Sequence, residues 1–163
     1  MENLNSILTA LITFCLGMAS GIFFLLYCLE EPLYSPVLKN NAFGVDSDTQ
    51  MRRVLMVLQQ FLSFRVPVVM VSLITCATLG PALHVTLYGF TPLPVLVALS
   101  SMGAIVYSGF LVPSSIKMFK NASTEALPSE LQESLAPIVR LHRNVGVCVA
   151  VTLMIQLTSV ALE

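Results

Sequence analysis

Residues 66–116 read VPVVMVSLITCATLGPALHVTLYGFTPLPVLVALSSMGAIVYSGFLVPSSI and contain no Lys, Arg, Asp or Glu. A helix needs about 20 apolar residues to cross the roughly 30 Å hydrocarbon core of a bilayer. The stretch is too long for one crossing and fits two crossings joined by a tight link. Glycines and prolines near its middle predict that link at residues 84–92. We therefore expect membrane spans at about residues 66–83 and 93–112.

Two further stretches lack charged side chains over a comparable length, at about residues 8–29 and 144–162. Backbone groups inside lipid must be hydrogen-bonded within their own segment, so these spans are helices. They are too long and too uniformly apolar for the alternating strands of a membrane barrel. The sequence therefore predicts an all-α fold, an integral membrane four-helix bundle. It forms a single four-span domain over residues 1–163, with connections at residues 30–65 and 113–143.

The composition of the whole chain agrees with a membrane protein. Of its 163 residues 56% are hydrophobic and 10% charged, and the mean hydropathy is +0.85. Soluble domains have roughly 45–50% hydrophobic and about 25% charged residues. These values exclude a disordered chain, a soluble globular enzyme and a nucleic-acid binder that needs a basic face. The expected partner of the chain is the lipid bilayer.

The positive charges fall on one side of the predicted topology. All eight Lys and Arg residues lie in the first and third connections. They are Lys39, Arg52, Arg53, Arg65, Lys117, Lys120, Arg140 and Arg143. Cytoplasmic loops of membrane proteins carry an excess of Lys and Arg. We therefore predict a multi-pass protein whose two long connections are cytoplasmic and whose two termini are on the non-cytoplasmic side.

Both long connections contain a predicted helix. Asp46, Ser47 and Asp48 offer N-caps for the first, and apolar residues follow at helical spacing: Met51, Val54, Leu55, Leu58, Phe61 and Leu62. This apolar face either packs against neighbouring helices or lies along the membrane surface. In the second, Ser129 and Gln132 have the spacing of a capping box. The residues Leu131, Leu135, Ile138 and His142 then share one face of a helix that continues into the last span.

Two sets of small residues are candidates for helix packing, because membrane helices approach one another through small side chains. Gly17 and Gly21 form a GxxxG motif in the first span, and Ser100, Ala104 and Ser108 form a small-xxx-small ladder in the third. Packing within the chain is one interpretation. Contact with a second copy or with another membrane protein is the other.

Several chemistries are disfavoured by the residues of the spans. Pumps and ion transporters usually carry acidic or basic residues inside the membrane, and these spans have none. No two of the four cysteines form a C-x-x-C pair, so a thioredoxin-type redox site is not indicated. His84 and His142 are expected at opposite membrane faces, about 30 Å apart. They cannot share one metal ion, and we predict no metal site.

The cytoplasmic ends of the helices gather the remaining polar residues. The candidates for ligand binding are Glu30, Arg65, Pro113, Lys117 and Asn144, together with Glu31, Arg140, His142 and Arg143. Opposite charges at a membrane interface should pair, so we expect Glu30 or Glu31 to contact Arg65, Arg140 or Arg143. A histidine in such a cluster is suited to act as a base. Either these charges anchor the helix ends, or they form a polar site open to lipid-soluble ligands.

Three short motifs resemble those of a known family. They are Gly17 and Gly21 with Glu31-Pro32-Leu33, then Leu111-Val112-Pro113-Ser114-Ser115, then Arg140-Leu141-His142-Arg143-Asn144. Together they resemble the anthrone oxygenase-like family of small four-helix membrane proteins, over nearly the whole chain. The tryptophan often found before the histidine in that family is absent, and the arginine spacing after the histidine differs. The resemblance implies an oxygen-dependent oxidation of an electron-rich aromatic. In it, His142 would be the catalytic base, Arg140 or Arg143 would stabilise the anion, and Glu31 would pair with an arginine.

Two classes of function follow. The first is a non-catalytic membrane component, which assists a partner complex or binds a neutral lipophilic molecule. The second is a membrane oxygenase that acts on an anthrone- or hydroquinone-like aromatic at the cytoplasmic end of the bundle. We favour the first class, because no catalytic motif stands out. The residues leave the cofactor and the oligomeric state open.

Overall fold

A computed structural model describes residues 2–31, 45–63, 66–90, 92–123 and 125–162, and it is helical almost throughout. Side chains are not described at residues 2–3, 45–47, 62–67, 71 and 108–120, although these lie mostly within helices. The helices are α1 (Glu2–Glu30), α3 (Val45–Ser63), α4 (Val66–Tyr88), α5 (Pro92–Asn121) and α6 (Pro128–Leu162). The described residues contain no strand, which confirms the predicted all-α class.

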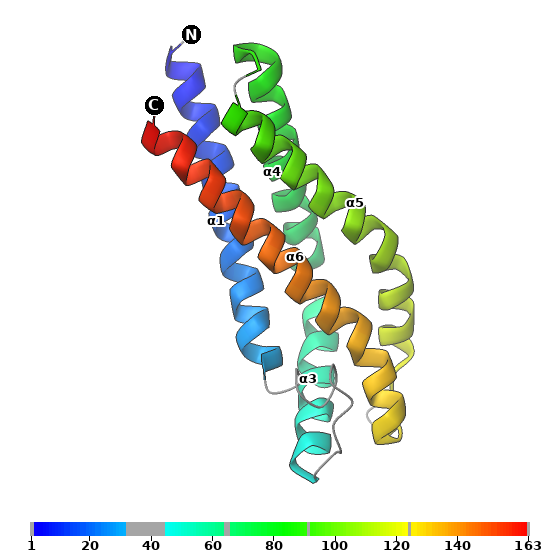
Figure 1. Cartoon of the computed structure of the whole chain (residues 1–163). Helices are drawn as coiled ribbons and strands as arrows, with labels where there is room; N and C mark the ends of the chain where they lie inside the picture. The colour runs from blue at the N-terminus through cyan, green and yellow to red at the C-terminus, as the bar shows by residue number, and fades with distance from the viewer. Residues whose placement is uncertain (1, 32–44, 64–65, 91, 124, 163) are drawn as a thin grey trace.

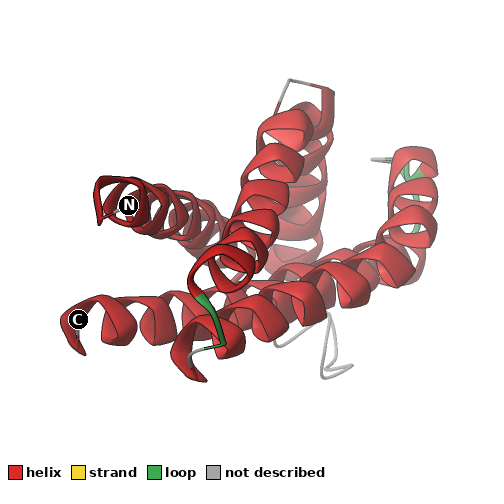
Figure 2. Ribbon diagram, turned by 90° about the horizontal axis from the view of Figure 1, so that it is seen from above, coloured by secondary structure: helices red, strands yellow, loops and turns green. Residues whose placement is uncertain are grey.

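The helices form an elongated bundle (Figure 1). Helix α6 packs against α1 and α5, α4 packs against the same two helices, and the shorter α3 contacts α6 and α4. Both termini and the α4–α5 turn lie at one end of the bundle, which we call the termini end. Helix α3 and the first half of α6, which carry Arg52, Arg53, Arg140 and Arg143, lie toward the other, which we call the basic end. Figure 2 views the bundle along its length and shows that helices make up almost all of the described chain.

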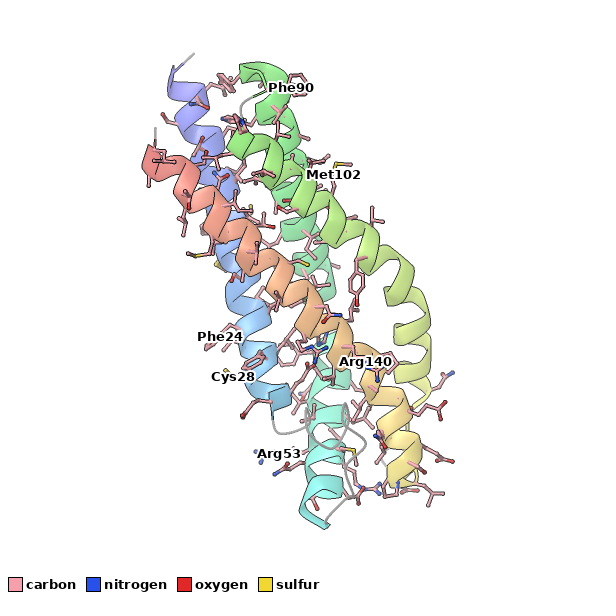
Figure 3. The ribbon with its side chains drawn as sticks, viewed as in Figure 1. Phe24, Cys28, Arg53, Phe90, Met102 and Arg140 are labelled. Carbon is pink, nitrogen blue, oxygen red and sulfur yellow. The ribbon has the colours of Figure 1, made fainter. Side chains whose placement is uncertain are left out.

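Three of the described helices are long and apolar enough to cross a membrane, which indicates a membrane protein. The apolar stretches are Leu4–Glu30 of α1, Val68–Tyr88 of α4 and Pro128–Leu162 of α6. In α5 the described apolar stretch, Pro92–Tyr107, is shorter than a full span. Large apolar side chains project outward from the bundle, among them Phe24 of α1 and Met102 of α5 (Figure 3). Outward-facing apolar side chains along a whole bundle are typical of a surface that lipid covers.

The turn between α4 and α5 is shorter than the sequence predicts. Helix α4 continues to Tyr88, and the turn begins at Gly89 rather than at residue 84. Gly89 has a φ of 95° and donates its N–H to the carbonyl of Val85 at 3.0 Å. A glycine in this left-handed conformation is a common way to end a helix. Pro92 then opens α5, where its missing N–H and fixed φ suit the first turn.

Helix α6 begins slightly earlier than its predicted capping box. Pro128 occupies the first helical position, and the Glu130 carboxylate accepts a hydrogen bond from the N–H of Leu127 at 3.2 Å. This is the acidic half of a capping box, made by Glu130 in place of the predicted Ser129 and Gln132. The helix then continues through Pro137 to Leu162, as the sequence predicts.

The apolar face of α3 packs inside the protein, which decides between the two interpretations of that helix. Met51, Val54, Leu55 and Leu58 are buried in one cluster with residues of α1 and α6. Leu131, Leu135 and Ile138, which the sequence places on one face of α6, belong to the same cluster. Phe61, at the end of the α3 face, is exposed, and the side chain of Leu62 lies outside the described residues.

Side-chain hydrogen bonds fasten α3 to the loop before α6. Arg52 pairs with Asp48 at 3.0 Å and also donates to the carbonyl of Ala126 at 3.1 Å. Further along α3, the Gln59 amide donates to the carbonyl of Ala122 at 3.0 Å. These carbonyls follow the end of α5, so α3 holds the α5–α6 connection in place at the basic end.

Candidate functional site

Glu30 and His142 form a close pair at the basic end. Glu30 is the last residue of α1, and His142 lies in the first half of α6. His142 Nδ1 is 2.6 Å from Glu30 Oε1. When Glu30 is ionised it only accepts, and Nδ1 then carries the hydrogen and donates it. This fixes the ring so that Nε2 is the nitrogen that remains for a ligand or a proton.

The environment of the pair is apolar on the glutamate side. Glu30 is 0% exposed, whereas the His142 side chain is 20% exposed. The Phe23 ring lies edge-on to the imidazole, with ring centres 6.4 Å apart. Phe23 and Leu26, from the last turns of α1, belong to the apolar cluster that α3 and α6 complete. A fully buried carboxylate is rare unless it is paired, so this geometry needs an explanation.

The second oxygen of Glu30 supplies the most informative detail of the site. Oε2 is buried and has no hydrogen-bond partner among the described residues. Buried polar atoms are nearly always hydrogen-bonded to protein, to water or to a ligand. A buried acceptor is thus left open beside the histidine. The pair can receive a hydrogen bond from a hydroxyl group and can orient His142 as a base.

A second polar contact joins α6 to α5 two residues after His142 in the sequence. The Asn144 amide donates to the Tyr107 hydroxyl at 2.7 Å, and Arg143 Nε lies 3.4 Å from the Asn144 oxygen. Tyr107 was not among the residues that the sequence singled out. Its phenol hydroxyl is a further polar group at the same end of the bundle as His142, and it comes from a neighbouring helix.

The described part of the expected charge pairing differs from the prediction. Among the described residues, the partner of Glu30 is His142 rather than an arginine. Arg140 and Arg143 are exposed, and so is Glu31, although all three lie at the basic end near the pair (Figure 3 labels Arg140). The physical reason is helix rotation, since positions 140 and 142 point about 200° apart on α6. The side chains of Arg65, Pro113 and Lys117 lie outside the described residues.

The points of closest helix approach differ from those predicted. A Cβ added at Gly17 or Gly21 would meet nothing within 4 Å in the described part of the chain. The tight contacts are at Gly80, where a Cβ would lie 2.7 Å from Ile12 Cγ1, and at Gly146, where it would lie 3.2 Å from Phe23 Cβ. Gly17 and Gly21 therefore do not hold the described helices together.

The serine and alanine ladder of α5 gives a different result. Ser100 accepts a hydrogen bond from the Thr152 hydroxyl of α6 at 2.9 Å, and Ala104 is buried. Ser108 lies where side chains are not described. The first member of the ladder is therefore an interhelical contact within the chain.

His84 is the clearest feature that sequence reasoning misplaced. We expected it at the turn, among lipid headgroups, but it is 7% exposed and lies one turn inside α4. Its Nε2 is 2.8 Å from the Asn5 side-chain oxygen of α1. The sequence of α6 did contain an indication of a polar interior at this end. Thr152, Gln156 and Ser159 place polar groups on one face of an apolar helix. Such a stripe predicts a polar interior facing it.

No group of three metal-ligating side chains occurs among the described residues, and the four cysteines are free thiols. Comparison with family models, with curated proteins and with solved structures finds no match to this chain. The resemblance to the anthrone oxygenase-like family therefore stays a prediction from its short motifs.

Proposed function

We propose that this chain is a four-span membrane protein that binds a neutral lipophilic molecule at the Glu30–His142 pair. One observation carries the proposal. Glu30 is fully buried, yet its Oε2 has no partner among the described residues. A hydroxyl group of a lipophilic ligand would complete that site. A hydroquinone- or anthrone-type phenol has both the hydroxyl and the apolar body that the surrounding cluster favours.

Equilibrium binding tests this proposal directly. The protein is placed in phosphatidylcholine nanodiscs and titrated with a lipophilic hydroquinone, with the variants E30Q and H142Q beside the wild type. A hydrogen bond to a charged group contributes about 1.5–3 kcal/mol, so E30Q should weaken binding about 10- to 100-fold. Cys28→Ser is the matched control, because Cys28 is exposed near the end of α1 (Figure 3). Wild-type affinity in E30Q would overturn the proposal.

A second candidate is the membrane oxygenase. The observation that favours it is the orientation of the histidine, since Glu30 holds Nδ1–H and leaves Nε2 as a base. In such a reaction His142 would take a proton from the phenol or the activated CH₂ group. Molecular oxygen would convert the CH₂ to a carbonyl and release one water. Arg140 and Arg143 are exposed, and a role in stabilising the anion requires either of them to turn toward the pair.

Oxygen consumption distinguishes the enzyme from the binder. The purified protein is mixed with an anthrone or a hydroquinone in an oxygen electrode. An oxygenase consumes oxygen in proportion to product and loses that activity in H142A, while H142A remains folded. A binder shows no protein-dependent uptake and still loses affinity in H142Q. Absence of uptake with both classes of aromatic would remove the enzyme from consideration.

We further propose that the basic end faces the cytoplasm. The support is the position of all eight Lys and Arg residues in two connections, together with the location of both termini at the opposite end (Figure 1). A tag fused to either terminus should react with a membrane-impermeant reagent in intact cells. A tag protected until the cells are permeabilised would contradict this orientation.

A further inference from the structure

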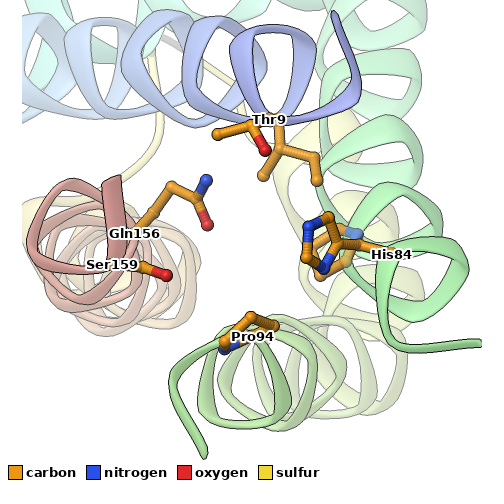
Figure 4. A pocket seen from close by; sticks show the side chains of 7 residues that line it. Thr9, His84, Pro94, Gln156 and Ser159 are labelled. Carbon is orange, nitrogen blue, oxygen red and sulfur yellow. The ribbon is translucent and has the colours of Figure 1, made fainter. Parts of the chain in front are cut away.

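A small cavity lies at the termini end of the bundle, far from the Glu30–His142 pair. Residues of α1, α4, α5 and α6 line it, and its polar walls are Thr9, His84, Gln156 and Ser159 (Figure 4). Its volume is about 10 Å³, which is room for about one water molecule. Along α1, position 9 is 21 residues from Glu30, or about 32 Å at 1.5 Å per residue.

His84 lines this cavity and carries an open acceptor on its ring. Its Nε2 donates to the Asn5 amide oxygen, which only accepts, so Nδ1 of the neutral ring carries a lone pair. Nδ1 is buried and has no hydrogen-bond partner among the described residues. The ring packs against Tyr88, with ring centres 5.1 Å apart, so its orientation is held on a second side.

Two side chains of α6 face the same space. Gln156 and Ser159 are both buried, and Figure 4 shows them pointing toward His84 across the cavity. The Gln156 amide also lies 3.4 Å from the Thr13 hydroxyl, which itself donates to the carbonyl of Thr9. Apart from His84, the described residues that line the cavity include no acidic or basic side chain, which disfavours an ion as its occupant.

We infer that this cavity binds a single hydroxyl group, which donates to His84 Nδ1 and accepts from Ser159. The open lone pair requires a donor, and the volume admits about one oxygen atom. A hydroxyl satisfies both walls because it donates and accepts at once. Two sources supply this chemistry in a membrane, namely a trapped water and the hydroxyl of a lipid alcohol. This hydroxyl site shares no residue with the Glu30–His142 pair, so the two proposals stand or fall separately.

Nitrogen NMR of the histidine ring tests the site. The chain has two histidines, so H142Q labelled with ¹⁵N-histidine reports on His84 alone. The protein is reconstituted in phosphatidylcholine nanodiscs with and without cholesterol. We expect the tautomer with Nε2 protonated, and an Nδ1 resonance shifted upfield from that of a free imine nitrogen. Should H142Q fail to fold, wild-type protein is used and the His84 signal is assigned by its loss in H84Q.

The cross-peaks of the ring identify the occupant. A cross-peak to water hydrogens in both membranes identifies water as the occupant. A cross-peak to sterol protons in the membrane that contains cholesterol identifies the lipid alcohol. Either result supports the site. Ser159→Ala should move the Nδ1 resonance toward the free-imine position, whereas Ser72→Ala, an exposed serine of α4, should not. Two results would overturn the inference. One is a protonated Nδ1. The other is an Nδ1 at the free-imine position that shows no cross-peak in either membrane.

Discussion

Removal of His142 should destabilise the protein more than removal of both members of the pair. In H142L the Glu30 carboxylate, 0% exposed and with Oε2 already unpartnered among the described residues, loses its 2.6 Å contact. The carboxylate is then an uncompensated buried charge, which costs about 3–5 kcal/mol. Replacing both partners with apolar residues of similar volume is often neutral or stabilising. We therefore expect E30M/H142L to regain most of the stability that H142L loses.

The assay is reversible unfolding of the purified protein in nanodiscs, followed by helical circular dichroism. A loss of 3–5 kcal/mol corresponds to about 6–20 °C in Tm for a chain of this size. Arg140→Leu is the matched control on the same helix, because Arg140 is exposed and its replacement should change stability by no more than about 0.5 kcal/mol. If the double variant is as unstable as the sum of E30M and H142L, the buried carboxylate is not the source of the loss. The argument from its unpartnered oxygen would then be refuted.

Two further predictions concern packing. Gly80→Ala should lower the free energy of unfolding by about 1–3 kcal/mol, since its Cβ would lie 2.7 Å from Ile12 Cγ1. Gly17→Ala is the control, because its Cβ would meet nothing within 4 Å. In the same unfolding assay it should be neutral or stabilising. Equal effects of the two substitutions would show that the contact with Ile12 is not tight. Arg52→Met should speed amide hydrogen exchange in residues 122–127, because it removes the bond to the Ala126 carbonyl; unchanged exchange there would mean that α3 does not hold this loop.

The helices were largely predictable from the sequence, and the reason is the simplicity of the signal. Uncharged stretches of spanning length mark where helices lie, and α1, α4 and α6 contain such stretches. The ends were less predictable. Helix α4 continues to Tyr88 because Gly89, rather than His84, takes the helix-ending conformation. The burial of His84 depends on Asn5 of another helix, which no local pattern around His84 reveals.

The structure brings Glu30 and His142 together at the basic end, and the sequence did not predict this contact. Opposite charge suggested an arginine for Glu30, while helix rotation gives it His142. The signal for the right partner was already in the sequence. His142 continues the face of Leu131, Leu135 and Ile138, which is the buried face of α6. A buried glutamate must pair with a residue of the buried face, so the helical period was a better guide than charge.

The buried face of α6 also separates the two polar sites from each other. At the termini end it carries Thr152, Gln156 and Ser159, and at the basic end it leads to His142. Between them the buried positions are Val145 and Val149, beside the close contact of Gly146 with Phe23. A proton or ion that crossed along this face would have to pass an apolar layer without a polar partner, which is unfavourable inside a membrane. The described arrangement therefore favours two separate binding sites, one at each end, over a continuous transport path.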